Sequence, residues 1–211
     1  DHLSEKHDSF FCSAPKEGAQ RHLLSNAFFI PEADLLVISV RRRAFPEKTM
    51  QMIRAFVESG KPVLGIRTSS HAFELRKEQA TEGHAEWPKW DTEVIGGNYQ
   101  GHLGKGLICN IEKTSESSNH PILEKVNLPF DTPATLYRNS PLPSASESLL
   151  EGRVKGFRKE PVAWTRLTSF GGKVFYTSLG HLEDFKKPAF NQLLKNAVSW
   201  CLSSKVQVQR R

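Results

Sequence analysis

Apolar side chains recur at the spacing of an α-helix in two stretches of the chain. In residues 46–59, Met50, Ile53 and Val57 fall on one side of a helix, a proline opens the segment and a glycine follows it. Residues 188–202 carry a continuous apolar face with the same spacing. The sequence therefore predicts two amphipathic helices whose apolar faces pack against the core.

Short apolar runs mark the expected strands. Residues 35–40 and 62–66 flank the first helix, and runs that are apolar on both faces are typical of a buried parallel sheet. A strand, a helix and a strand in this order predict a right-handed βαβ unit. Apolar and aromatic residues predict further strands over residues 106–112, 161–167 and 173–178. A turn at Gly171-Gly172 is expected to join the last two.

These elements predict an α/β fold, a three-layer, doubly wound and mostly parallel sheet of flavodoxin-like type. We expect one domain over residues 1–204 and a disordered tail over residues 205–211. Residues 1–7 resemble the end of a helix, and residues 9–13 resemble a strand after it. The first strand and most of the first helix of such a fold are therefore expected to be missing from this chain.

Composition narrows the class of protein. Of the 211 residues 38% are hydrophobic and 25% charged, which is typical of a folded globular chain, and no apolar run approaches the roughly 20 residues of a membrane-spanning helix. The net charge of +6 comes from scattered bases without a nucleic-acid-binding motif. We therefore expect neither a membrane nor a nucleic-acid partner, and a homo-oligomer stays open.

Cysteine usage bears on the compartment. The three cysteines are an odd number and form no CxxC pair, which favours a reducing environment and hence the cytoplasm. The expected loss of an N-terminal segment leaves an exported form open.

Residues 65–73 follow a predicted strand and carry the first candidate chemistry. Their strand–turn–helix form is that of a nucleophile elbow, but Arg67 stands in the turn, and a guanidinium cannot attack an amide. Thr68 and the two serines behind it could cap the following helix, or a serine could act as nucleophile if a base lay nearby. His71 is open between an ordinary helix histidine, a general base and a metal ligand.

Residues 96–104 contain four glycines, which allow the backbone to approach a ligand closely. Asn98, Gln100 and His102 add neutral hydrogen-bonding groups, and Tyr99 lies between them. Such a set suits a polyol better than a phosphate. The alternative is a mobile turn without a ligand.

Two further segments offer charged groups at the ends of predicted strands. His181 and Glu183 have the H-x-E spacing with which a carboxylate can orient an imidazole, or they are ordinary surface residues. Arg41 and Arg43 alternate, so both would face the same way if the preceding strand continued. They could then hold an anionic group, or be solvated.

Taken in order, these segments resemble the ThuA-like family, named for trehalose utilisation. The resemblance rests on KPVLGIRTSSHAFE, GGNYQGHLG, NHPIL, PVAWTR, GGKVFYTSLGHLEDF and a closing NAVSWCL helix, over about residues 33–202. It implies a class I glutamine amidotransferase-like fold and a role in carbohydrate metabolism, particularly of disaccharides and their keto forms. The family's pocket positions correspond here to Arg41, Arg43, Arg67, Thr68, His71, Asn98, His102, His181 and Glu183.

The sequence departs from the amidotransferase pattern at one position. An amidotransferase would carry cysteine where Arg67 stands, so we expect no glutaminase activity. We expect a hydrolase or lyase acting on a sugar, with His181 (oriented by Glu183) or His71 as general base and Arg67 or Arg43 polarising a carbonyl. The alternative is a module that binds a sugar or a partner protein without turnover.

A metal is an open element of this prediction. His71, His102 and His181 could share a zinc ion if they converge in space. Their separation in the sequence matches no metal-ligand motif.

Overall fold

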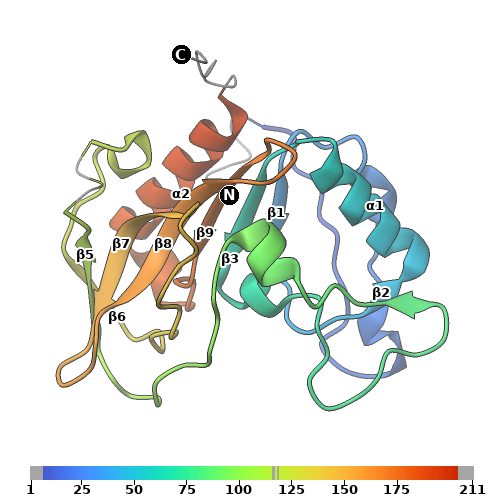
Figure 1. Cartoon of the computed structure of the whole chain (residues 1–211), viewed down its shortest axis with the longest axis horizontal. Helices are drawn as coiled ribbons and strands as arrows, with labels where there is room; N and C mark the ends of the chain where they lie inside the picture. The colour runs from blue at the N-terminus through green and yellow to red at the C-terminus, as the bar shows by residue number, and fades with distance from the viewer. Residues whose placement is uncertain (1–6, 116, 118, 204–211) are drawn as a thin grey trace.

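The computed structural model describes residues 7–115, 117 and 119–203 (Figure 1). Apart from His7, which is not helical, the expected N-terminal helix lies outside these residues, as does the expected tail. Within the described part, no helix combines the length and the apolar character needed to cross a membrane.

One sheet forms the centre of the molecule and confirms the α/β class. Two of its neighbouring pairs, β1–β3 and β3–β9, are parallel, and the remaining pairs are antiparallel. Five strands nevertheless run in one direction, because only β8 and β5 are reversed. The seven strands, in their spatial order, are β1 (Leu36–Ile38), β3 (Val63–Ile66), β9 (Lys173–Thr177), β8 (Glu160–Leu167), β7 (Glu147–Arg153), β5 (Cys109–Lys113) and β6 (Phe130–Thr132).

Helices cover both faces of this sheet (Figure 1). Helix α1 (Glu47–Glu58) and helix α2 (Pro188–Leu202) confirm the two predicted amphipathic segments. A small second sheet pairs β2 (Phe45–Pro46) with β4 (His84–Ala85). Short helical turns complete the described structure: η1 (Ala19–His22), η2 (Ala27–Phe29), η3 (Arg67–His71), η4 (Asp91–Ile95), η5 (Pro121–Leu123) and η6 (Asp184–Lys186).

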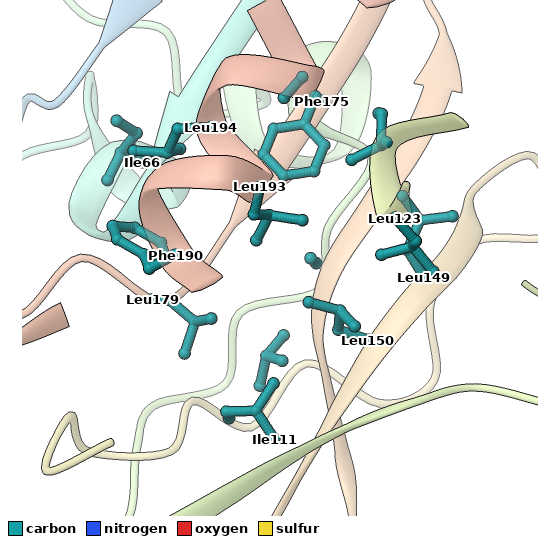
Figure 2. Packing of buried hydrophobic residues seen from close by; sticks show 14 of the residues in the cluster. Ile66, Ile111, Leu123, Leu149, Leu150, Phe175, Leu179, Phe190, Leu193 and Leu194 are labelled. Atoms are coloured by element: carbon teal, nitrogen blue, oxygen red, sulfur yellow. The ribbon is translucent and has the colours of Figure 1, made fainter. Parts of the chain in front are cut away.

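Alternation along the central strands divides the core into two clusters. Val63 of β3 and Val174 of β9 belong to the cluster that contains the apolar face of α1. Their neighbours Leu64 and Phe175 belong to the other cluster, which contains Phe190 and the rest of the apolar face of α2 (Figure 2). Because the inner strands are buried on both faces, they read as continuous apolar runs in the sequence.

The strand expected at residues 9–13 is wrong. This segment has no strand pairing, and the ring of Phe11 is 75% exposed. It is held instead by single contacts with the following turn, such as the bond that Asn26 Nδ2 donates to the Phe11 carbonyl. A strand forms only beside a partner, and β1, the edge strand, pairs with β3 alone among the described residues.

Candidate functional site

A cavity of about 420 Å³ lies beyond the carboxyl ends of β1 and β3, where ligands collect in open α/β sheets. Several chain segments far apart in the sequence contribute to it, and polar or charged residues make up nearly all of its lining. The lining residues are Arg42, Ser70, His71, Glu74, Arg76, Asp91, Tyr99, Gln100, Gly101, His102 and Arg138.

The turn after β3 has the strained backbone of an elbow. Arg67 has φ of 49°, in the left-handed region that only a few per cent of non-glycine residues adopt. Its guanidinium donates to the carbonyl of Ser178 at 3.1 Å and to the Thr135 hydroxyl at 3.2 Å, and it lies over the ring of Tyr137. Arg67 does not line the cavity, so its side chain braces the elbow against neighbouring segments.

His71, from the same turn, is buried at the cavity wall. Burial lowers its pKa to about 3, and the positive charges of Arg42 and Arg41 act in the same direction. Its ring stacks on Tyr99 with 4.5 Å between centroids, which joins the elbow to the glycine-rich loop. At neutral pH this imidazole is therefore uncharged and can exchange hydrogen bonds with a ligand.

Hydrogen bonds hold the backbone and side chains of this turn in place. The Tyr176 hydroxyl donates its proton to the Arg67 carbonyl at 2.7 Å. Burial raises the pKa of Tyr176 well above its usual value, so this hydroxyl keeps its proton. The Ser70 hydroxyl lies 3.0 Å from His71 Nδ1, and the two side chains share a hydrogen bond.

Asp91, at the start of η4, is the second titratable group with a strongly shifted pKa in the cavity. Burial raises the pKa of its carboxyl to about 6, although the bond from the Tyr99 backbone N–H to Oδ2 opposes the shift. The other oxygen, Oδ1, is buried without a hydrogen-bond partner and lies against Gly97. A carboxyl group with a pKa near neutrality can both accept and return a proton.

Arg42 lines the cavity, whereas Arg41 and Arg43 were the arginines expected there. Strand β1 ends at Ile38, so the alternation that would have paired Arg41 with Arg43 does not continue. Arg42 has φ of 50°, lines the cavity and donates to the Glu74 carbonyl. Arg43 instead donates to the backbone carbonyls of Arg41 and Pro15. Arg41 is exposed and does not line the cavity.

The glycine-rich loop is partly a ligand surface and partly a brace. Tyr99, Gln100 and His102 line the cavity. Asn98 does not, because its amide donates to the Pro141 carbonyl at 3.0 Å. The Nδ1–H of His102 donates to the Leu103 carbonyl at 2.7 Å. Thr68, half-buried in η3, is also absent from the lining.

The loop after β9 does not form the expected H-x-E pair. The Glu183 carboxylate bonds to Lys186 Nζ at 2.7 Å, and only its backbone N–H reaches His181, donating to Nδ1 at 3.2 Å. The carboxylate that organises this loop is Asp184, which is fully buried and accepts from the backbone N–H groups of Gly180 and His181. Neither His181 nor Glu183 lines the cavity.

The three histidines do not gather as metal ligands. Within the described residues, no three His, Cys, Asp or Glu side chains are grouped so that they could hold a metal ion. The cysteines lie elsewhere: burial raises the pKa of Cys109 in β5 to about 11 and that of Cys201 in α2 to about 12, and Cys12 belongs to the N-terminal segment. No thiolate is therefore available at the elbow.

The cavity is also lined by charged residues that were not predicted: Arg42, Glu74, Arg76, Asp91 and Arg138. Asp91 lies in a stretch without regular spacing, and its burial depends on the glycines that follow it. Arg138 comes from a proline-rich segment that offers no periodic pattern. Arg42 follows a predicted strand, but Arg41 and Arg43 share this signal.

The cavity and the braced elbow occur in a chain whose residues 24–201 match the family model ThuA, described as trehalose utilisation. The chain belongs to the ThuA family. This match confirms the resemblance seen in the linked motifs and covers most of the described structure. No curated protein matches the sequence.

Solved structures agree with this ThuA assignment at the level of the fold. A ThuA-like protein from Bacteroides uniformis ATCC 8492 is 19% identical, with a TM-score of 0.62 over 85% of this chain and 73% of that one. A ThuA-like protein from Parabacteroides merdae ATCC 43184 is 17% identical, with a TM-score of 0.61 over 99% and 83%. A β-galactosidase from Rahnella sp. R3 is similar at 14% identity and a TM-score of 0.53, over 81% of this chain and 23% of that one.

Proposed function

We propose that this ThuA domain acts on a carbohydrate, a disaccharide or its keto form, in the cavity beyond β1 and β3. The family's link with trehalose utilisation supports this substrate class. The volume of about 420 Å³ is within the usual range of small-molecule sites. The lining offers hydroxyl, amide and imidazole groups that suit a polyol.

The observation that carries the proposal is the pair of opposite pKa shifts in one cavity. Asp91 has a pKa of about 6, and His71 has a pKa of about 3. Titratable groups whose environments push their pKa values in opposite directions are typical of acid–base sites. Asp91 is suited to move a proton at neutral pH, whereas His71 remains neutral and positions a hydroxyl group.

On a keto-sugar, this arrangement supports a lyase step. The Asp91 carboxylate takes a proton from the carbon next to the carbonyl, and the electrons of that C–H bond form an enolate. Arg42 or Arg138 stabilises the enolate oxygen. When the carbonyl reforms, the glycosidic C–O bond on the following carbon breaks, and the leaving oxygen takes the proton from Asp91. These roles replace those expected for His181, Glu183 and Arg67, which lie outside the lining.

The test is turnover of trehalose and of keto-trehalose by the purified chain, followed by NMR. We expect the keto form to be cleaved, Asp91→Asn to abolish cleavage, and Asp34→Asn, a change at an exposed carboxylate, to leave it unchanged. Full cleavage by Asp91→Asn would exclude Asp91 as the base.

A second function has one observation in its favour. The elbow carries Arg67, whose side chain makes bracing contacts with neighbouring segments, in place of a nucleophile. A sugar-binding module without turnover would need no nucleophile. Saturable binding of the keto-sugar without cleavage would favour this function.

A further inference from the structure

We infer that the cavity selects a sugar that carries a negative charge, a carboxylate or a phosphate group, over a neutral sugar. This inference rests on the proposed carbohydrate function and deepens it. It is based on the arginines that line the cavity and on their lack of ion pairs with carboxylates.

Three arginines from separate segments line the cavity: Arg42 after β1, Arg76 after η3 and Arg138 in the loop before β7. In the described part of the chain, ion pairs form at Arg21, Lys125, Lys159 and Lys186, and none involves these three arginines. Arginines that converge on a cavity without carboxylate partners are a typical arrangement for binding an anion.

The hydrogen bonds of these arginines leave their charge uncompensated. Arg42 Nη1 donates to the backbone carbonyl of Glu74, and Arg138 Nη2 donates to that of Gln100 at 3.2 Å. A carbonyl orients a guanidinium without neutralising it. Both side chains are therefore positioned by the backbone, while other N–H groups of each fork stay available for a ligand.

The acidic residues of the lining do not cancel this charge. Glu74 is exposed and has no ion pair with the neighbouring arginines. Asp91 likewise forms no ion pair with these arginines, and its Oδ2 accepts instead from the Tyr99 backbone N–H. The positive charges of Arg42, Arg41 and Arg76 each act to lower the pKa of His71, so positive charges surround this part of the cavity wall.

The rest of the lining indicates a sugar rather than a free inorganic anion. Tyr99, Ser70 and Gln100 place neutral polar groups beside the arginines, and a small ion would leave these groups unused. The Gln100 amide also donates to the Ser140 carbonyl at 3.2 Å. A charged sugar can bond to both sets at once. The guanidinium fork matches the oxygen atoms of a carboxylate or of a phosphate. The arginines therefore indicate a negatively charged ligand without distinguishing between these two groups.

Isothermal titration calorimetry at low salt can test this selectivity, with D-glucuronate, glucose 6-phosphate, glucose and inorganic phosphate as the ligands. We expect at least one of the two charged sugars to bind about tenfold or more tightly than glucose, and more tightly than phosphate. The preferred charged sugar then identifies the anionic group.

Arginine variants locate the effect. Arg42→Gln and Arg138→Gln should each weaken binding of the preferred charged sugar by about tenfold and should weaken the binding of glucose far less. Arg158→Gln removes an exposed arginine that does not line the cavity, and it should bind like the wild type. Circular dichroism confirms that each variant is folded.

The outcomes separate this inference from the function beneath it. Glucose bound as tightly as both charged sugars would overturn the charge selectivity and leave the carbohydrate function standing. Inorganic phosphate bound as tightly as glucose 6-phosphate, with glucuronate no better than glucose, would support an anion site and overturn the carbohydrate function. No binding of either charged sugar would overturn the inference.

Discussion

Asp91 and Asp184 are both buried carboxylates beside a loop that carries a histidine, yet their surroundings differ. Asp184 is satisfied on both oxygens: Oδ1 accepts from the Thr132 hydroxyl, and Oδ2 accepts from two backbone N–H groups. Asp91 accepts one bond, from Tyr99, and its second oxygen has no partner. Only Asp91 lines the cavity.

The difference teaches how to tell a structural carboxylate from a chemical one. A carboxylate whose oxygens are filled by fixed donors stabilises the fold, and its charge is already compensated. A carboxylate with an unfilled oxygen costs free energy of folding, which is tolerated where a function depends on it. On this criterion the loop of His181 supports the fold, and the cavity of His71 is the candidate site.

The largest effect is expected from Asp91→Asn on turnover. The amide keeps the size of the side chain but cannot take a proton, so kcat/KM for keto-trehalose should fall by about 10²–10⁴-fold. The melting temperature at pH 7 should not fall, since the buried charge is gone. Steady-state kinetics and thermal denaturation check both statements. A large fall in melting temperature would make Asp91 a structural residue like Asp184.

Asp184→Ala should show the opposite pattern. It leaves two backbone N–H groups and the Thr132 hydroxyl without their acceptor, so the free energy of unfolding should fall by about 3 kcal/mol. For a chain of this size the melting temperature then falls by about 6–12 °C. Turnover per folded molecule should be reduced far less than in Asp91→Asn. Unchanged stability with lost turnover would reverse the roles of the two residues.

The pH dependence of stability separates the two shifted groups of the cavity. The folded pKa of Asp91 is about 6 against an ordinary value of 3.8, so between these values the folded state binds more protons and stability falls as pH rises. The folded pKa of His71 is about 3 against 6.5, so here the unfolded state binds more protons and stability rises with pH. Each contributes about 1 kcal/mol per pH unit near pH 5.

Single variants should therefore change the slope of stability near pH 5 in opposite directions. Asp91→Asn should make the free energy of unfolding rise more steeply with pH, and His71→Asn should make it rise less steeply or fall. Urea denaturation at several pH values between 4 and 6.5 measures this slope. Slopes equal to that of the wild type in both variants would contradict the assigned burial of the two groups.

The smallest effect is expected from Glu183→Gln. Its carboxylate is exposed and pairs with Lys186 on the surface, so its removal should change neither the melting temperature nor turnover measurably. Lys186→Gln serves as the matched control and should give the same result. A marked loss of turnover in Glu183→Gln alone would restore the H-x-E interpretation of this loop.

Elements with their own periodicity could be predicted from the sequence. Helices α1 and α2 each carry an apolar stripe, and β3 and β9 are apolar runs because both of their faces are buried. Strand β7 was not predicted, and its structure gives the physical reason. Its register shifts around Leu150, so Leu149 and Leu150 are both buried in succession and the alternation of a strand is broken.

The site was predictable where the chain's connectivity determines it. The turn after β3 and the glycine-rich loop were expected to face a ligand, and both line the cavity with His71, Tyr99, Gln100 and His102. The role of Asp91 could not be predicted, because its pKa depends on packing between segments rather than on its neighbours in the chain. Arg42 could not be distinguished from Arg41 and Arg43, since a left-handed residue decides which of the three turns inward.

Gly97 has no side chain, yet its position restricts which residues can stand there, because it lies against the Asp91 carboxyl. A Cβ atom added there would lie 2.4 Å from Oδ1 of Asp91, so any other side chain would displace the carboxyl. In a population of random variants under selection for activity, we expect Gly97 to tolerate as few replacements as Asp91. Selection at this position would then retain glycine because no side chain fits there, and not because a chemical group is needed.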